Sequence, residues 1–89
     1  MSSWTFLSNH AHVLLCVAAN PDQTLHEIAV QVGVTERAVQ LILADLINSG
    51  YVERTRVGRR NHYLVHPEGP LRHPQQAHHQ VADLLRALQ

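Results

Sequence analysis

The sequence predicts a mainly helical α+β domain, in which three helices precede a two-stranded β-hairpin and a fourth helix closes the chain. Three observations predict it. Apolar residues recur at helical spacing in four stretches, turn residues separate these stretches, and the spacing changes to a period of two at Tyr51. The chain has 89 residues, which is enough for one domain and too few for two. We therefore expect residues 1–89 to form a single domain.

The first helix is predicted over residues 6–19, and Asn20-Pro21-Asp22 should end it by turn chemistry. Two apolar stripes run along this stretch, so the helix should be buried on two sides. The first stripe is Phe6, His10, Val13, Leu14 and Val17, and the second is Leu7, Ala11, Leu15 and Ala18.

The next two helices are short and follow each other almost without a gap. Thr24 and Glu27 have the spacing of a capping box, and Gly33 is typical of the residue that ends a helix. Thr35 is a good N-cap for the helix that follows. Two short helices joined by a glycine turn predict a helix-turn-helix over residues 24–49.

Residues 51–66 are predicted to form a β-hairpin because they are rich in Val, Thr and Tyr. Its strands should span residues 51–56 and 61–66, with Val57-Gly58 between them. The formal net charge of the chain is zero, but this hairpin carries four arginines and one acid, which gives a local charge of +3. A phosphate group responds to that local charge. The arginines are Arg54, Arg56, Arg59 and Arg60, and the acid is Glu53.

A cluster of turn residues, His66-Pro67-Glu68-Gly69-Pro70, separates the hairpin from a last helix, which is predicted over residues 74–88. An isolated helix of this length is marginal in water, so its apolar stripe must pack on something. If the last helix packs against the second apolar side of the first helix of a partner, across a two-fold axis, both apolar surfaces become buried. The sequence therefore predicts a homodimer. The interface residues would be Val81, Leu84, Leu85 and Leu88. The alternative is that this dimerisation helix folds back on its own subunit and the protein is a monomer.

The second helix of a helix-turn-helix enters the major groove of DNA, and its N-terminal residues meet the base edges. Arg37 can read guanine and Gln40 can read adenine through paired hydrogen bonds. The free N–H groups near Thr35 favour a phosphate. The outward residues expected to contact DNA are therefore Thr35, Glu36, Arg37, Gln40 and Leu41, together with the four hairpin arginines.

A helix-turn-helix followed directly by a basic hairpin is the winged-helix arrangement. The stretches VTERAVQLILADLINSGYVERTRVGRRNHYLV and WTFLSNHAHVLLCVA resemble the MarR- and ArsR-type winged-helix regulators of bacteria and archaea. The resemblance covers residues 4–66, and GYV and GRRNHY are its most telling parts. It implies a dimeric DNA-binding regulator whose wing reaches phosphates or the minor groove. Arg59, Arg60 and Asn61 occupy the wing positions, and Thr35, Glu36, Arg37 and Gln40 occupy the recognition positions.

The chain departs from this pattern at two positions. Leu41 stands where a basic residue is frequent, and Ile47 stands where a polar residue is usual. Both could touch a thymine methyl group or a protein instead of a polar base edge.

The same sequence gives no support for catalysis, a cofactor or a metal. It contains no nucleophile elbow, no phosphate-cradling glycine loop and no convincing carboxylate pair. Eight histidines are present without a cysteine pair or a dense ligand set, so we expect them on the surface or in packing. Cys16 is the single cysteine, so no intrachain disulfide can form, which fits a reducing cytosol. We expect Cys16 to lie in the core.

Neither a membrane span nor a signal peptide is predicted. The longest apolar run, residues 13–19, is far short of the roughly 20 residues that a span needs. The first residues, MSSWTF, have no basic leader. These features predict a cytoplasmic protein.

The sequence therefore predicts a sequence-specific double-stranded DNA-binding transcriptional regulator that acts as a homodimer and is not an enzyme. Its operator and any small-molecule effector stay open. The alternative is a winged helix that binds protein. Leu41, Ile47 and the zero net charge favour this alternative, and the arginine-rich wing opposes it.

Overall fold

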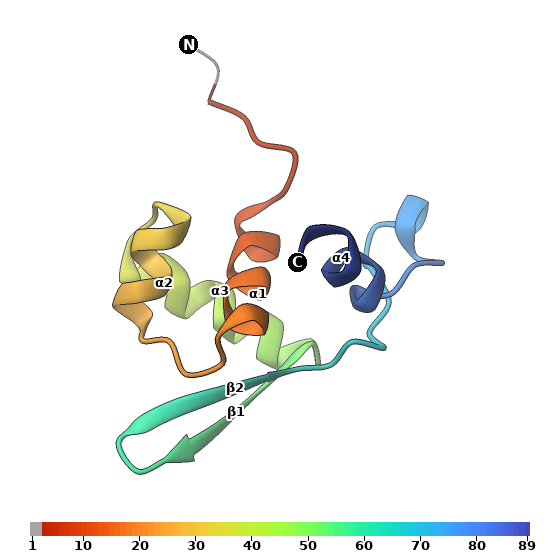
Figure 1. Ribbon diagram of the computed structural model, residues 1–89. Helices are drawn as coiled ribbons and strands as arrows, with labels where there is room; N and C mark the ends of the chain where they lie inside the picture. Colours follow the sequence, from red (N-terminus) through yellow and green to blue (C-terminus); the bar gives the residue numbers. More distant parts are fainter. Residues whose placement is uncertain (1–2) are drawn as a thin grey trace.

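The computed structural model describes residues 3–89 and confirms the predicted mainly helical fold with one antiparallel hairpin (Figure 1). Three helices come first, the hairpin follows them directly, and a short helix ends the chain. None of the helices in the described part of the chain has the length and apolar character to cross a membrane. The elements are α1 (Asn9–Ala19), α2 (Leu25–Val32), α3 (Glu36–Asn48), β1 (Val52–Val57), β2 (Arg60–Val65), the 3₁₀ helix η1 (Pro74–Gln76) and α4 (Val81–Leu88).

The turn between α2 and α3 forms as the local sequence predicts. The Thr24 hydroxyl accepts a hydrogen bond from the Glu27 N–H at 3.1 Å, and the Glu27 carboxylate accepts one from the Thr24 N–H at 3.1 Å. Gly33 adopts a left-handed φ of 83°, which a residue without a Cβ adopts at no steric cost. Thr35 then caps α3 by accepting from the Ala38 N–H at 3.0 Å. These contacts fix where the recognition helix begins.

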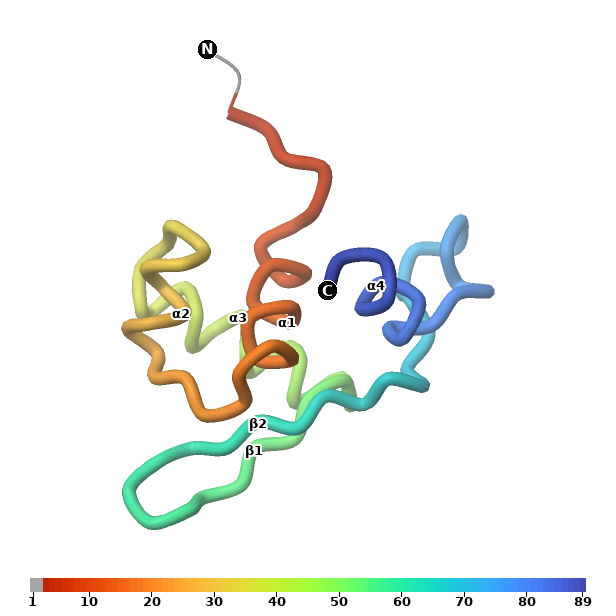
Figure 2. The backbone as a smooth tube through the Cα atoms, in the orientation of Figure 1, coloured from red at the N-terminus to blue at the C-terminus, as the bar shows by residue number. Residues whose placement is uncertain are grey.

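The hydrophobic core lies where α1, α2 and α3 meet the base of the hairpin (Figure 2). The hairpin is tied to the helical part by its backbone as well, because the Tyr63 N–H donates to the Pro21 carbonyl at 2.9 Å. The buried apolar side chains are Val13, Leu14, Val17, Ile28, Ala29, Val39, Ile42, Leu43, Leu46, Val52, Tyr63 and Val81.

The predicted start of the first helix, at Phe6, is wrong by three residues. Ser8 is the N-cap, with its hydroxyl accepting from the Ala11 N–H at 3.2 Å, and α1 begins at Asn9. Phe6 therefore precedes the helix, and 92% of its surface is exposed. Residues 3–8 form an arm that leads away from the body (Figure 1). The capping serine overrides the apolar spacing that had included Phe6.

The hairpin is present, but its turn lies one residue later than predicted. Val57 pairs with Arg60, so the two turn residues are Gly58 and Arg59 rather than Val57 and Gly58. Gly58 has a φ of 63°, and Arg59 has no positive φ. This is the pattern of a type II′ turn, which needs glycine at its first central position. The shift places Arg59 at the tip of the wing.

The predicted helix over residues 74–88 is interrupted. The chain makes one 3₁₀ turn at Pro74–Gln76 and begins α4 only at Val81. Gln80 is extended, forms an isolated β-bridge with Pro70, and donates its N–H to the Asp83 carboxylate at 2.9 Å. A residue held extended in this way cannot continue a helix, so the element restarts after it.

The side of α4 that carries Val81 packs on α1 of its own chain. Val81 is 1% exposed and belongs to the core, and the Gln89 amide donates to the Leu15 carbonyl at 3.1 Å. The predicted packing of α4 on α1 is thus present within one chain. The helix therefore folds back on its own chain, as in the alternative given above, while the homodimer stays a prediction.

Candidate nucleic-acid interface

The recognition helix α3 buries one side and exposes the other. Val39, Ile42, Leu43 and Leu46 face the core. Every residue that we expected to meet DNA from this helix lies on the exposed side, and Leu41 exposes 58% of its surface. These exposed residues are Thr35, Glu36, Arg37, Gln40 and Leu41.

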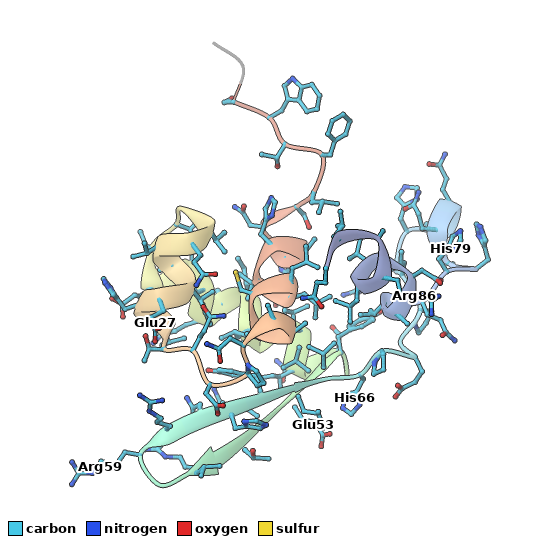
Figure 3. The ribbon with its side chains drawn as sticks, in the orientation of Figure 1. Glu27, Glu53, Arg59, His66, His79 and Arg86 are labelled. Carbon is cyan, nitrogen blue, oxygen red and sulfur yellow. The ribbon has the colours of Figure 1, made fainter. Side chains whose placement is uncertain are left out.

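The wing presents its arginines on both faces of the hairpin. The register pairs Arg54 with Tyr63 and Arg56 with Asn61, so these side chains share the face that also carries the buried Tyr63. Arg60 lies on the opposite face, and Arg59 points outward from the tip (Figure 3). All four arginines are exposed.

Asn61 is half-buried and positioned by its neighbours. Its amide lies 3.5 Å from the Tyr63 hydroxyl. Together with Arg54, Thr55 and Arg56 it lines a polar hollow of about 390 Å³ on the wing. The size and lining of this hollow suit a hydrated phosphate or a sugar edge.

The arginines of α3 and the wing have no acidic partner within residues 3–89. Arg37, Arg54, Arg56, Arg59 and Arg60 form no salt bridge there. The acids are engaged by histidines instead: six of the seven carboxylates lie within salt-bridge distance of a histidine ring. The pairs are His10–Asp45, His26–Glu36, His62–Asp22, His66–Glu53, His66–Glu68 and His79–Asp83. The positive charge of the wing therefore stays available to an external anion.

A cleft of about 190 Å³ lies between the wing and the start of α2. The sequence reasoning did not predict that these two elements lie side by side. Arg59 and Arg60 line the cleft on one side, and Thr24 and Leu25 line it on the other. The capping bond from the Thr24 backbone lowers the pKa of the Glu27 carboxyl, and the nearby charge of Arg60 adds a smaller effect. The Thr24–Glu27 spacing shows where α2 starts, but no local signal places that start beside the wing.

Sequence reasoning also missed His26. Its Nδ1 lies 3.3 Å from a carboxylate oxygen of Glu36, in the first turn of α3. A carboxylate at that place would repel DNA phosphates, and the contact with His26 occupies one of its two oxygens. The two residues are ten positions apart on different helices, so no sequence periodicity reveals the pair.

The four residues expected in a dimer interface are in different environments. Val81 is buried by its own chain and has no surface left for a partner. Leu84 and Leu85 are half-buried against the core. Leu88 exposes 51% of its surface. The apolar surface of α4 that remains available to a partner subunit is therefore Leu88 and the outer parts of Leu84 and Leu85.

Cys16 is half-buried against the core rather than fully inside it. Its Sγ donates to the Gln31 amide oxygen at 3.4 Å, and burial raises the pKa of its thiol. A raised pKa disfavours the reactive thiolate. Across residues 3–89, no three or more His, Cys, Asp or Glu side chains gather in a way that could hold a metal ion.

Comparison with known proteins places this geometry among DNA-binding regulators. The family described as winged helix-turn-helix DNA-binding matches residues 9–53. Among curated proteins, none matches the chain. FabT of Streptococcus pneumoniae, solved in complex with DNA, is 26% identical, with a TM-score of 0.59 over 73% of this chain and 48% of that one.

Two further solved structures share the fold. The PcaV transcriptional regulator of Streptomyces coelicolor, in complex with its natural ligand, is 22% identical, with a TM-score of 0.62 over 98% of this chain and 63% of its own. ZitR of Lactococcus lactis, a zinc-responsive MarR family member, is 24% identical, with a TM-score of 0.57 over 73% of this chain and 46% of its own. The chain spans about half the length of the solved regulators PcaV and FabT.

These similarities support the MarR part of the resemblance and give no specific support to the ArsR part. The matched residues, 9–53, run from the start of α1 through the recognition helix into β1. The rest of the wing follows that stretch directly. The chain belongs to the winged helix-turn-helix DNA-binding family.

Proposed function

We propose that the protein is a sequence-specific double-stranded DNA-binding transcriptional regulator that acts as a homodimer and performs no covalent chemistry. One observation carries this proposal. The exposed arginines of α3 and the wing are free of acidic partners in the described chain, whereas histidines engage six of the seven carboxylates. A surface arranged in this way attracts phosphates although the whole chain has no net charge.

The recognition helix supplies the base contacts. Arg37 forms paired hydrogen bonds to guanine, and Gln40 forms them to adenine. Leu41 contacts a thymine methyl group, which is the apolar feature of the major groove. The wing arginines hold the backbone or the minor groove, and they fix the register of the helix. FabT, to which the chain is similar, was solved in complex with DNA, and this supports DNA as the partner.

Two such helices related by a two-fold axis lie about 34 Å apart, which is one turn of DNA and favours a palindromic operator. Bound there, the dimer acts by blocking or recruiting other proteins at a promoter. The exposed apolar residues Trp4, Phe6 and Leu88 support the dimer, because a partner can cover them.

A selection of bound sequences from a random duplex pool tests the specificity. We expect enrichment of a palindrome with half-sites one helical turn apart. Arg37→Ala should relax the preference at one position in each half-site, because the loss of a bidentate contact costs about 1–3 kcal/mol of discrimination there. A pool that is bound but not enriched would show that binding is non-specific.

A second candidate function is recognition of a protein by the same helices. Leu41 exposes 58% and Val30 exposes 67% of their surfaces, and a protein partner could cover both. Binding to a protein through these side chains would be insensitive to salt. Leu41→Lys separates the two functions, because the added charge should strengthen binding to a random duplex, whereas it should abolish an apolar protein contact.

A further inference from the structure

The wing is hydrogen-bonded to the helical part of the molecule at one place. Residues 53–60 are all exposed, so the outer part of the hairpin has little contact with the body. Among the described residues, the hydrogen bonds that join β1 and β2 to the helical part both end on the turn between α1 and α2 (Figure 1). The Tyr63 N–H donates to the Pro21 carbonyl at 2.9 Å, and Nδ1 of His62 lies 2.8 Å from Oδ1 of Asp22. We call residues 20–23 the anchor turn.

The two contacts hold the anchor turn in different ways. Tyr63 exposes only 2% of its surface and faces the core, and its N–H donates to Pro21 rather than to β1. His62 is the preceding residue of the strand, so its side chain lies on the opposite face of the hairpin, where it meets Asp22. An ionised carboxylate only accepts hydrogen bonds, so Nδ1 of His62 is the donor. The edge of β2 thus bonds both the backbone and a side chain of the anchor turn.

The anchor turn is itself fixed to two helices. Gln23 is buried, with 4% of its surface exposed. Its Nε2 donates to the Cys16 carbonyl of α1 at 2.7 Å, and its Oε1 accepts from the Gln31 amide of α2 at 2.6 Å. Asn20 closes the turn by accepting from the Asp22 N–H at 3.1 Å. The turn therefore cannot move without breaking bonds to α1 and α2, and it gives the wing a rigid support.

Small rotations about this support are amplified at the tip of the wing. Arg59 lies four residues beyond Tyr63, which corresponds to about 13 Å along a strand. A rotation of the hairpin by about 10° would therefore move the backbone of Arg59 by about 2 Å. Hydrogen-bond lengths vary by only about 0.5 Å, so such a movement is enough to lose a phosphate. The wing must be held at its base if its arginines are to act at fixed positions.

Asp22 lies where a carboxylate is unfavourable for DNA binding. It lines the same cleft as Arg59 and Arg60, so its charge opposes theirs toward a phosphate. Its side chain forms no salt bridge with either arginine, and its partner is His62. The contribution of Asp22 to the site is therefore the hydrogen bond and not the charge.

We propose that Asp22 and His62 are positioning residues, whose hydrogen bond holds the wing on the anchor turn at the angle at which its arginines reach DNA. The proposal rests on the DNA binding proposed above and names two residues that set its strength without touching a base or a phosphate. When the bond is lost, the wing is docked in a smaller fraction of the molecules. The apparent affinity for DNA falls by that fraction.

Two neutral substitutions at Asp22 isolate the hydrogen bond. Asp22→Asn and Asp22→Ala remove the same charge, but only asparagine keeps an oxygen that can accept from His62. Asp22→Ala should bind a labelled random duplex about fivefold more weakly per wing than Asp22→Asn, and about 25-fold more weakly as a dimer, because a hydrogen bond contributes this much on average. The ratio should be the same at every salt concentration, because a docked wing makes the same contacts. Loss of a direct phosphate contact would change the slope of log K against log salt by about 0.9 for each wing.

The mobility of the wing is measured without DNA, by NMR. Relaxation of the amides at the wing tip reports fast motion, and hydrogen exchange of the Tyr63 amide reports opening of its bond to the anchor turn. In Asp22→Ala the order parameters at the tip should fall and the Tyr63 amide should exchange faster, whereas Asp22→Asn should stay close to the parent. His62→Ala should resemble Asp22→Ala. The double variant should be no more mobile than either, because all three remove one bond.

Asp45→Ala is the matched control. His10 and Asp45 lie 2.8 Å apart on the surface, as His62 and Asp22 do, but they join α1 to α3. Asp45→Ala should leave the wing as ordered as in the parent. Thermal unfolding of every variant separates a loosened wing from a loss of global stability.

The outcomes separate the positioning role from DNA binding. If the wing of Asp22→Ala is as ordered as that of Asp22→Asn, the hydrogen bond does not hold it and the proposal is wrong. A looser wing with unchanged DNA affinity, or with a changed salt slope, overturns the positioning role and leaves DNA binding standing. If the parent itself does not bind the duplex, the proposed function fails, and the order of the wing alone decides whether the pair holds it.

Discussion

Replacing Arg59 and Arg60 by alanine removes two exposed, unpaired arginines from the wing of each protomer and four from a dimer. Each phosphate contact contributes about −0.9 to the slope of log K against log salt, so the slope should become shallower by up to about 3.6. Over the decade from 1 M to 0.1 M salt, one contact amounts to about eightfold in affinity. The loss at 0.1 M should therefore be about 60-fold if one arginine per protomer engages, and about 4,000-fold if both do.

The assay is fluorescence anisotropy of a labelled random duplex, titrated at several salt concentrations. The double variant should keep the parent's thermal unfolding, because exposed side chains without partners usually change stability by less than about 0.5 kcal/mol. The control replaces Arg86 by alanine, because Arg86 contacts Asp83 within α4, away from the recognition helix and the wing. If the wing variant keeps the parent's affinity and slope, or if the control loses as much, then the wing is not the contact.

Two further predictions concern the α2 cap and α4. Thr24→Ala should cost about 1 kcal/mol of stability by removing the cap of α2, as measured by denaturant unfolding. The folded state lowers the pKa of Glu27, chiefly through the hydrogen bond from the Thr24 backbone N–H, so the contribution of its carboxylate is complete above the unfolded value of about 4.3 and is lost as pH falls through the lower folded value; the stability cost of Glu27→Gln should therefore shrink in acid, and a cost that grows there would refute the cap. Leu88→Glu should leave folding unchanged and weaken the dimer in sedimentation, since half of this side chain is exposed; Arg86→Glu on the same helix tests whether added charge alone has that effect.

Local capping chemistry explains which elements the sequence could predict. Thr24, Glu27, Gly33 and Thr35 specify the helix-turn-helix through hydrogen bonds and a backbone angle that involve only near neighbours. The exposed side of α3 follows from helical periodicity once its start is known. The sequence therefore predicts the recognition helix and its exposed residues, while their contacts with DNA stay a prediction.

The errors arise where a local bond or a distant contact overrides the apolar pattern. Ser8 caps α1 and excludes Phe6 from it. The bridge between Gln80 and Pro70 interrupts the last helix, and these residues are ten apart in the chain. Four of the histidine–carboxylate pairs, those of Asp45, Glu36, Asp22 and Glu53, join residues ten to 40 positions apart, so these four follow from the tertiary fold alone. The same holds for the cleft between the wing and α2.

The salt dependence of binding to a random duplex tests the central claim most directly, because it counts the phosphates that the free arginines neutralise. Five arginines per protomer, one on α3 and four on the wing, allow at most about ten contacts per dimer. Since not all engage together, we expect a slope of log K against log salt between about −4 and −8. A slope near zero would contradict DNA binding by this surface and would favour a winged helix that binds protein.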